Sequence, residues 1–225
     1  VMAKTVALAG FDIIKDDDHL MNQKWAMWEE RTRIVCEAVA EANAETGFKT
    51  MFAPCLNIPA ERVLEAAHKA KEWGAGSVLI LPGVTGFDSM RAIAENDKLG
   101  FVVQAHPSSL GSMVVPDTQG FTSGVVFGTM NRLAGADLSI YVNMGGRFSF
   151  TKEQCLDVAD KCRAPLGKLK QTWPTPAGGM KLEQIPEMVD MYGDDVAFLI
   201  GGALSRGDLA TNAKKTVEQV MAMEG

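Results

Sequence analysis

The sequence lacks the features that mark several classes of protein. No apolar run approaches the roughly 20 residues that a membrane span needs, and no charged-then-apolar secretory segment opens the chain. The net charge is −6, so there is no basic excess to neutralise the phosphates of a nucleic acid. We therefore expect a cytoplasmic protein that binds neither a membrane nor a nucleic acid.

Cysteine pairs at metal-binding or redox spacing are also missing. The four cysteines, Cys36, Cys55, Cys155 and Cys162, form no CxxC pair and have no histidine at ligand spacing. Scattered cysteines of this kind are reduced in the cytoplasm. Low-complexity tracts and linker-like stretches are absent as well, so residues 1–225 are expected to form one domain.

The chain does contain a regular alternation of short apolar runs and amphipathic stretches. Most of the runs are continuously apolar, as in strands that are buried on both faces. They predict seven strands, at 11–15, 50–53, 77–81, 101–106, 138–142, 172–176 and 196–200. The stretches between them predict helices at 28–43, 60–73, 88–97, 118–134, 152–163, 182–191 and 208–223.

Strands that alternate with helices predict a parallel α/β fold, for which two architectures compete. A doubly wound sheet calls for a glycine-rich loop after its first strand, but here that loop is Asp16-Asp17-Asp18, which repels phosphate. Glycine pairs follow the last two strands instead, at Gly178-Gly179 and Gly201-Gly202, and their backbone N–H groups can bind an anion. Because this is the usual phosphate site of a (β/α)8 TIM barrel, we predict that fold.

The start of the chain suggests that the barrel is incomplete. Residues 1–8 are typical of the end of a helix, which Gly10 stops in the position that a C-terminal cap favours. Counted back from the glycine pairs, 11–15 is the second barrel strand, so seven of the eight strands are expected in this chain. An open barrel has an unpaired edge, and we expect poor stability alone or a partner that fills the gap.

Lys15 is the first candidate for chemistry, because barrel active sites lie at the carboxyl ends of the strands. It ends a buried run, where an unpaired ammonium is costly, and it can face the same side as Asp17. A neutral lysine can add carbon dioxide, and the carbamate with Asp17 and Asp18 is a hard-oxygen set for Mg2+. Without the carbamate, Lys15 could form a Schiff base as in an aldolase, and a solvated loop of charge is the third interpretation.

Other candidates follow other predicted strands. His106 ends the strand 101–106, and His19 follows the acidic cluster as a second acid–base candidate. Asn57 is a weaker candidate for a metal or substrate contact. The paired glycines at 145–146 allow a flexible loop that could bring Arg147 over an anionic substrate, although the loop could also be an ordinary surface turn.

At these residues the sequence resembles the RuBisCO large-chain superfamily, specifically its RuBisCO-like, non-carboxylating (form IV) branch. Residues 10–18 (GFDIIKDDD) are similar to the family signature GGxDxxKDDE. Residues 28–47 resemble the family's helix after strand two, and 177–204 resemble its strand-seven and strand-eight region. The resemblance covers nearly the whole chain and implies the C-terminal barrel domain of an obligate homo-oligomer, most simply a homodimer, without the N-terminal domain.

The resemblance also implies a role for each candidate. Lys15 matches the lysine that is carbamylated and binds Mg2+. Asp17 and Asp18 match the two carboxylate ligands, although the family usually has glutamate at the second position. His106 matches a histidine near the substrate. The phosphate-binding backbone is matched by Gly178, Gly179, Gly201 and Gly202.

Four departures from the carboxylases are informative. Pro107 stands where they have a phosphate-binding arginine, Ile140 where they have a histidine, and Ala177 where they have a serine. Arg147 replaces the mobile-loop lysine that helps to stabilise the carboxylated intermediate. One retained and one weakened phosphate site suit a monophosphate better than a bisphosphate, and the lost lysine argues against carboxylation.

Together these residues predict a Mg2+-dependent enzyme that enolises a keto-sugar phosphate through a metal-bound enediolate. The reaction would be that of an isomerase, a tautomerase or a decarboxylase. Three alternatives stay open: a ribulose-bisphosphate carboxylase proper, a Schiff-base aldolase that uses Lys15, and a degenerate barrel without catalysis.

Overall fold

The computed structural model describes residues 2–116, 118, 120–145 and 150–223, and its strands are all parallel. They are β1 (Ile13–Lys15), β2 (Met51–Ala53), β3 (Ser77–Ile80), β4 (Val102–Ala105), β5 (Leu138–Val142) and β6 (Trp173–Ala177). β1 pairs with β2, and β3 to β6 form a second sheet in sequence order. A bridge between Cys55 and Leu79 joins the two sheets. The predicted parallel α/β fold is therefore present.

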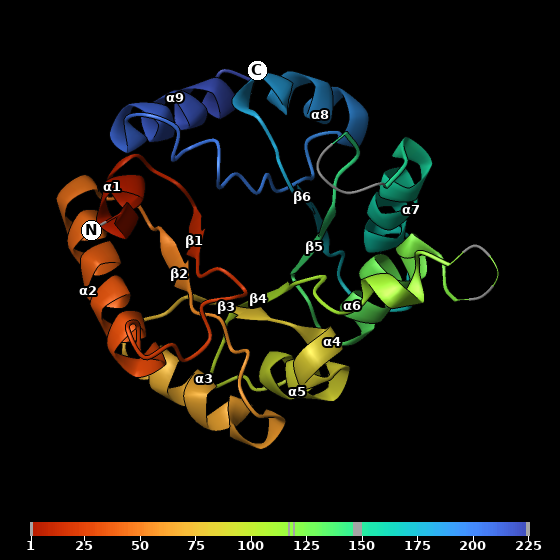
Figure 1. Cartoon of the computed structure of the whole chain (residues 1–225), viewed down its shortest axis with the longest axis horizontal. Helices are drawn as coiled ribbons and strands as arrows, with labels where there is room; N and C mark the ends of the chain where they lie inside the picture. The colour runs from red at the N-terminus through yellow and green to blue at the C-terminus, as the bar shows by residue number, and fades with distance from the viewer. Residues whose placement is uncertain (1, 117, 119, 146–149, 224–225) are drawn as a thin grey trace.

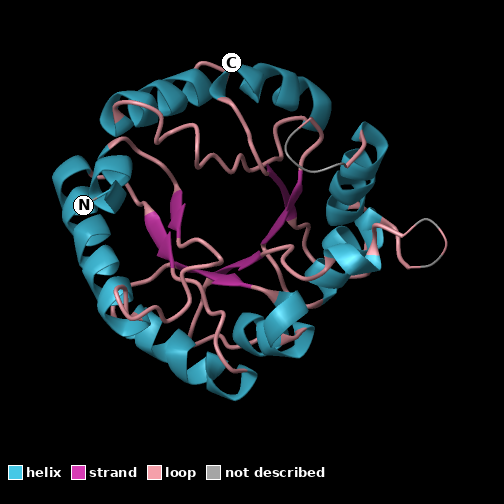
Figure 2. Cartoon of the chain, in the orientation of Figure 1, coloured by secondary structure: helices cyan, strands magenta, loops and turns pink. Residues whose placement is uncertain are grey.

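Helices follow the strands and lie outside the arc that the strands form (Figure 1, Figure 2). They are α1 (Met2–Leu8), α2 (Trp28–Thr46), α3 (Val63–Glu72), α4 (Pro82–Thr85), α5 (Phe87–Ala94), α6 (Asn131–Leu133), α7 (Lys152–Arg163), α8 (Ile185–Tyr192) and α9 (Leu209–Met221). Shorter turns are η1 (Ala60–Arg62), η2 (Gly111–Met113), the π-helical η3 (Gly124–Met130) and η4 (Leu182–Gln184). None of the described helices has the length and apolar character of a membrane span.

The seventh predicted strand, 196–200, is the exception, because this segment forms no strand. It starts beside β6, where the N–H of Ala197 donates to the carbonyl of Pro174 at 3.0 Å. On this side of β6 the N–H groups would come from Pro174 and Pro176, which have none. A ladder therefore cannot form, and the prediction from the apolar run was wrong. Within the described residues the strands make an open arc, and a closed barrel stays a prediction.

The core lies on both faces of this arc. Two large clusters of buried apolar side chains lie between the strands and the outer helices. In β3, Val78 and Ile80 belong to the first of these clusters, so Leu79 between them points to the opposite face of the arc. It belongs there to a third cluster: Cys55, Leu79, Leu81 and Ile140, with Leu199 packed against it. Burial on both faces explains why the strands read as continuous apolar runs.

The predicted helices mostly begin and end near the expected residues. α7 spans 152–163 as predicted, because Thr151 caps its first turn and Gln154 completes the capping box. The predicted helix at 118–134 is different, since regular structure starts only at η3. Gly124 and Gly128 of η3 pack against α7, and a side chain at either glycine would meet Asp157 or Lys161.

Gly128 provides a test of this packing. An alanine Cβ there would lie 2.5 Å from the Cβ of Lys161, which is too close for two carbon atoms. We expect Gly128→Ala to lower the free energy of unfolding by about 1–3 kcal/mol, although alanine favours helices over glycine. Gly111→Ala is the control, because nothing lies within 4 Å of its added Cβ. Urea unfolding that shows Gly128→Ala as stable as the parent would contradict the contact.

The four cysteines are free and buried, as the reading of reduced thiols requires. Burial raises the pKa of Cys36 to about 11 and the pKa of both Cys55 and Cys162 to about 12. Burial also raises the pKa of Cys155. Because the thiolate is the reactive form, we expect none of the thiols to react with Ellman's reagent at pH 8 while the protein is folded. All should react in guanidinium, and a fast native phase would contradict this packing.

Candidate active site

The end of β1 directs its acidic residues to two different places. Lys15 is the last residue of β1, and its Nζ donates to the backbone carbonyl of Asp16 at 3.1 Å. The carboxylate of Asp16 is buried and turns to α2, where Arg31 donates from Nη2 at 3.1 Å and from Nε at 3.2 Å. The N–H of Cys55 donates to the same oxygen at 3.3 Å. Asp16 therefore anchors the loop and is not available to a ligand.

The charge of Asp16 depends on this anchor. Burial raises the pKa of the Asp16 carboxyl group, while the charge and hydrogen bonds of Arg31 and the N–H of Cys55 oppose the rise. A carboxylate in this place would be strongly destabilising without its guanidinium partner.

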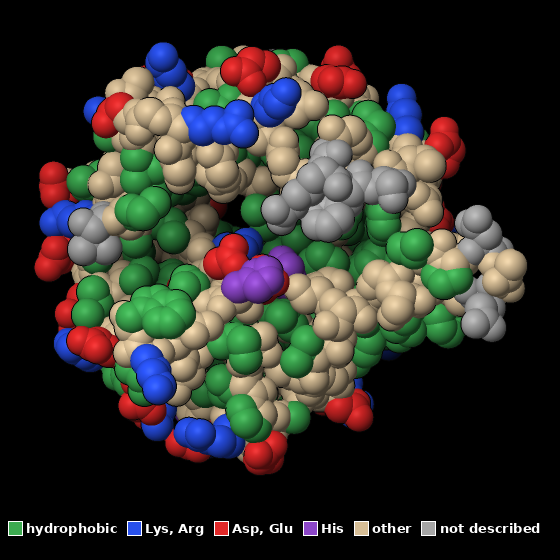
Figure 3. Space-filling model, in the orientation of Figure 1, with side chains coloured by type: hydrophobic (Ala, Val, Ile, Leu, Met, Phe, Trp, Pro, Cys, Tyr) green, Lys and Arg blue, Asp and Glu red, His purple; other side chains and the backbone are tan. Residues whose placement is uncertain are grey.

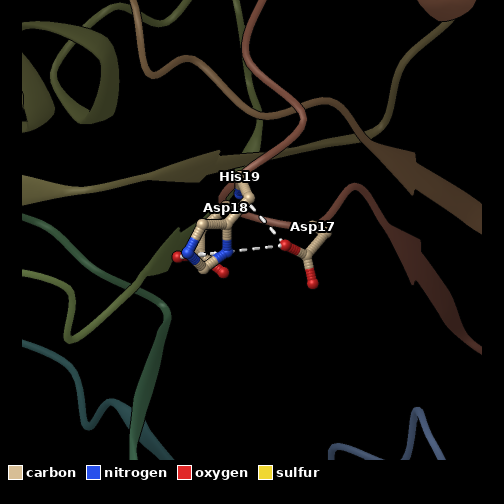
Figure 4. A group of neighbouring side chains, drawn as sticks. All are labelled: Asp17, Asp18 and His19. Carbon is tan, nitrogen blue, oxygen red and sulfur yellow. Dashed lines mark hydrogen bonds and ion pairs between the residues drawn. The ribbon is translucent and has the colours of Figure 1, made fainter.

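Asp17, Asp18 and His19 form a compact group at the head of the loop (Figure 4). Nδ1 of His19 lies 3.0 Å from Oδ1 of Asp17 and 3.3 Å from Oδ2 of Asp18. The ligand atoms of the three residues all lie within 4.8 Å of one another. Two carboxylates and an imidazole at this separation fit a divalent cation. Lys15, the third predicted ligand, lies beside the group, and its amine is hydrogen-bonded to the backbone carbonyl of Asp16.

The electrostatics of this group favour positive charge. The hydrogen bond to Asp17, then the charges of Asp18 and Asp17, raise the pKa of the exposed His19. Burial opposes ionisation of Asp17, but the N–H and the ring of His19 and the charge of Lys15 leave the pKa of Asp17 below its usual value. The same carboxylates would attract a metal ion.

His106 reaches this group from the end of β4. Its Nε2 lies 3.7 Å from Oδ1 of Asp18, and its Nδ1 lies 2.9 Å from Oγ of Ser108. Burial lowers the pKa of His106 to about 4 against the opposing charge of Asp18, so the imidazole is neutral at pH 7. The structure thus brings together two predicted residues that are 88 positions apart in the sequence. Figure 3 shows histidine and acidic side chains at the centre of this face, beside a hollow.

Ser108 is a residue that the sequence reading missed. Its hydroxyl donates to Oδ2 of Asp18 at 2.9 Å, which links the loop after β4 to the loop after β1. The only sequence signal was a hydroxyl two positions after His106, in the string His106-Pro107-Ser108. Asn57, the weaker candidate, also lies here, with its Nδ2 3.5 Å from the backbone carbonyl of Asp18.

The two glycine pairs differ in their surroundings. Gly178 and Gly179 directly follow β6 with φ values of 93° and 94°, which favour glycine, and they line a small pocket. The other residues of that pocket are Asn143, Met144, Gly145, Met180 and Gln184. Gly201 and Gly202 are exposed and do not line it. Only the first pair is therefore brought against the loop after β5.

Asn143 holds the ends of β5 and β6 together at this pocket. Its backbone N–H donates to Ala177 at 2.8 Å, and its buried side-chain carbonyl accepts the hydroxyl of Tyr192 at 2.8 Å. The side-chain amide lies 3.2 Å from the sulfur of Met180. The remaining predicted residue, Arg147, lies outside the described residues, as does Gly146.

A larger pocket, with a volume of about 580 Å³, lies between α2 and α3, away from the strand ends. Its charged residues neutralise one another: Lys69 lies 2.7 Å from Glu29 and 3.1 Å from Glu65. We therefore place the candidate site at the carboxyl ends of the strands, because the acidic residues, His106 and the Gly178-Gly179 turn lie there.

Comparison with known proteins gives consistent matches over almost the whole chain. The family model for the ribulose bisphosphate carboxylase large chain, catalytic domain, matches residues 2–217. A 5-methylthioribulose-1-phosphate isomerase of Rhodospirillum rubrum is 36% identical over 204 residues, which are 90% of this chain and 52% of that protein. A 2,3-diketo-5-methylthiopentyl-1-phosphate enolase of Bacillus licheniformis is 31% identical over 198 residues, which are 88% of this chain and 49% of that protein.

A solved structure agrees with these matches. The RuBisCO-like protein of Rhodopseudomonas palustris is 34% identical and superposes with a TM-score of 0.90, over 100% of this chain and 60% of that one. The chain spans about half the length of the curated relatives that it matches.

The ion pair between Asp16 and Arg31 can be tested on its own. Arg31→Met leaves a buried carboxylate without a partner, so we expect the free energy of unfolding to fall by about 3–5 kcal/mol. The control is Arg33→Met on the same helix, whose side chain is 52% exposed and pairs with Glu37. It should cost less than about 1 kcal/mol. If urea unfolding gave equal losses for the two variants, the anchor would not be the ion pair.

Proposed function

This chain belongs to the ribulose bisphosphate carboxylase large-chain family, and we propose that it supplies the catalytic residues of a RuBisCO-like enzyme that enolises a keto-sugar phosphate. The observation that carries the proposal is the convergence of Asp17, Asp18 and His106 from two strand ends. Two carboxylates that can hold a cation then lie beside a neutral imidazole that can accept a proton. The related isomerase and enolase, whose named substrates are 1-phosphates, support the substrate class.

Mg2+ is the proposed cofactor. Asp17 and Asp18 would hold it, together with Lys15 once carbon dioxide has converted the amine to a carbamate, which needs the amine to leave the Asp16 carbonyl. When bound, the ion lowers the pKa of a C–H group next to a carbonyl by stabilising negative charge on oxygen. His19 adjoins both carboxylates and would supply a further ligand atom for the ion.

The chain's own residues would position the substrate around this group. His106 is placed to take the C–H proton at Nε2 and to return it at a neighbouring carbon, which is an isomerisation. The N–H groups of the Gly178-Gly179 turn would bind the phosphate, with Asn143 fixing the turn against β5. Gly201 and Gly202 would extend that phosphate site, and Arg147 would lie over the substrate.

We further propose that the arc of strands is part of a (β/α)8 barrel, in which β1 to β6 are the second to seventh strands. The similarity to the RuBisCO-like structure supports this reading. Residues 1–225 would then be the larger part of the barrel domain. A homodimer or higher homo-oligomer and a cytoplasmic location stay predictions.

Calorimetry of Mg2+ binding with and without bicarbonate tests the site. We expect binding that depends on bicarbonate, because the carbamate supplies the third ligand. Lys15→Ala should weaken it at least about 10-fold, by analogy with the loss of groups that support a metal ligand. Lys24→Ala is the control, because this exposed lysine lies in the same loop outside the metal group.

The outcomes separate the proposal from its alternatives. If Mg2+ binds, the next measurement is exchange of substrate protons with D2O, using a keto-sugar monophosphate. Fixation of carbon dioxide on a keto-sugar bisphosphate would indicate a carboxylase instead. Trapping of a Lys15 adduct by borohydride, without inhibition by EDTA, would indicate a Schiff-base aldolase. Absence of Mg2+ binding under every condition would contradict the enzymatic proposal for this chain.

A further inference from the structure

We propose that Ser108 is a positioning residue that holds the imidazole of His106 with a hydrogen on Nδ1 and leaves Nε2 facing the site as the proton-accepting nitrogen. The inference rests on the proposed function for the meaning of the free Nε2, but the hydrogen-bond arrangement stands on the geometry alone. Ser108 lies between two groups that this function uses, Asp18 and His106.

The three side chains form a chain of short contacts. Oγ of Ser108 lies 2.9 Å from Oδ2 of Asp18 and 2.9 Å from Nδ1 of His106. Both partners are largely enclosed, since the side chains of His106 and Asp18 are 16% and 15% exposed. Water therefore competes little for either hydrogen bond.

The direction of each hydrogen bond follows from what each group can do. A carboxylate only accepts, so the single hydroxyl hydrogen of Ser108 is donated to Asp18. The serine oxygen then faces Nδ1 as an acceptor, and that nitrogen must carry the ring hydrogen. In a neutral imidazole the other nitrogen, Nε2, then has the lone pair. It lies 3.7 Å from Oδ1 of Asp18, too far for a hydrogen bond, so the lone pair is not consumed.

One contact points the other way. The backbone N–H of Ser108 lies 3.4 Å from Nδ1 of His106, and as a donor it would favour a lone pair there. This distance is at the outer limit for a hydrogen bond, whereas the contact with Oγ is short. The shorter contact, which also satisfies Asp18, decides the assignment. The two arrangements predict opposite tautomers, so an experiment can distinguish them.

The backbone around Ser108 is held in place for this task. Ser109 has a φ of 67°, the one positive φ of a described residue other than glycine, which turns the chain directly after Ser108. Gly83 of α4 lies under this turn, where a Cβ would be 2.5 Å from the backbone oxygen of Ser108. The close approach of two backbones fixes the hydroxyl relative to β3 and β4 rather than leaving it on a mobile loop.

The consequence is that one hydroxyl orients both a proposed metal ligand and a proposed base. Asp18 follows β1 and His106 follows β4, and Nε2 of His106 lies 3.7 Å from Oδ1 of Asp18, beyond hydrogen-bonding distance. Without Ser108, the imidazole could turn or change tautomer, and Asp18 would lose a hydrogen bond. Partners of this kind commonly change metal affinity or activity about 10–100-fold.

The test is nitrogen-15 NMR of histidine-labelled protein at pH 8 in EDTA, with the His106 signals identified by their absence in His106→Gln. We expect the Nδ1–H tautomer in the parent chain. Ser108→Ala should shift His106 toward the Nε2–H tautomer, which free imidazole side chains in water prefer. Ser108→Thr, which keeps the hydroxyl, should retain the parent tautomer. Ser112→Ala, at an exposed serine in the next turn, is the control and should change nothing.

Two results would overturn the proposal: an Nε2–H tautomer of His106 in the parent chain, or the same tautomer in Ser108→Ala as in the parent. The measurement contains neither metal nor substrate, so it stands or fails separately from the proposed function. Calorimetry with Mg2+ in bicarbonate then reports on that function, and we expect Ser108→Ala to bind the ion about 10-fold more weakly. Equal Mg2+ affinity of Ser108→Ala and the parent chain would show that Ser108 does not position Asp18 for the ion.

Discussion

Parallel pairing of the strands is the constraint on which the site depends. Each parallel strand ends on the same rim of the sheet, so residues that are distant in sequence meet wherever they follow a strand. Lys15 follows this rule at β1, His106 at β4 and Gly178 at β6. The chemistry at the rim therefore needs no special folding of its own. It needs only that each strand end at its polar group or one residue before it, in the register that the apolar faces fix.

The backbone after β1 sends neighbouring acids to two places. The carboxylate of Asp16 reaches back to Arg31 of α2. The chain then turns, with the N–H of Leu20 donating to the carbonyl of Asp17 at 3.1 Å, and this brings the carboxylates of Asp17 and Asp18 together at the rim. A buried carboxylate is costly without a partner, and the guanidinium supplies two hydrogen bonds to one oxygen. The ion pair thus fixes the loop that presents the other two acids. A run of three aspartates looks redundant in sequence, but in the fold one side chain anchors the loop and the other two lie together at the rim.

Sequence periodicity predicted most of the fold, because burial on both faces leaves an unbroken apolar run in each strand. It failed at 196–200, where the run is apolar but Pro174 and Pro176 remove the donors that a neighbouring strand would need. The cause of this failure lies in the sequence of β6, and a pattern within 196–200 alone contains no information about it. Ser108 was missed for a related reason, since its role exists only once β1 and β4 stand near each other. Lys15, Asp17, Asp18 and His106 could be named as candidates because a strand end is a local feature.

The shorter carboxylate at Asp18 illustrates how such a site can compensate for a change in one side chain. The family usually has glutamate here, whose additional methylene would extend the carboxylate further from the backbone. In this chain the carboxylate of Asp18 stays near β4, at 2.9 Å from Ser108, and His19 approaches it to 3.3 Å from the solvent side. The side chains of Asp18 and Ser108 together connect the loop after β1 to the loop after β4. Ser108 therefore contacts the carboxylate at the place that the length of the aspartate side chain gives it.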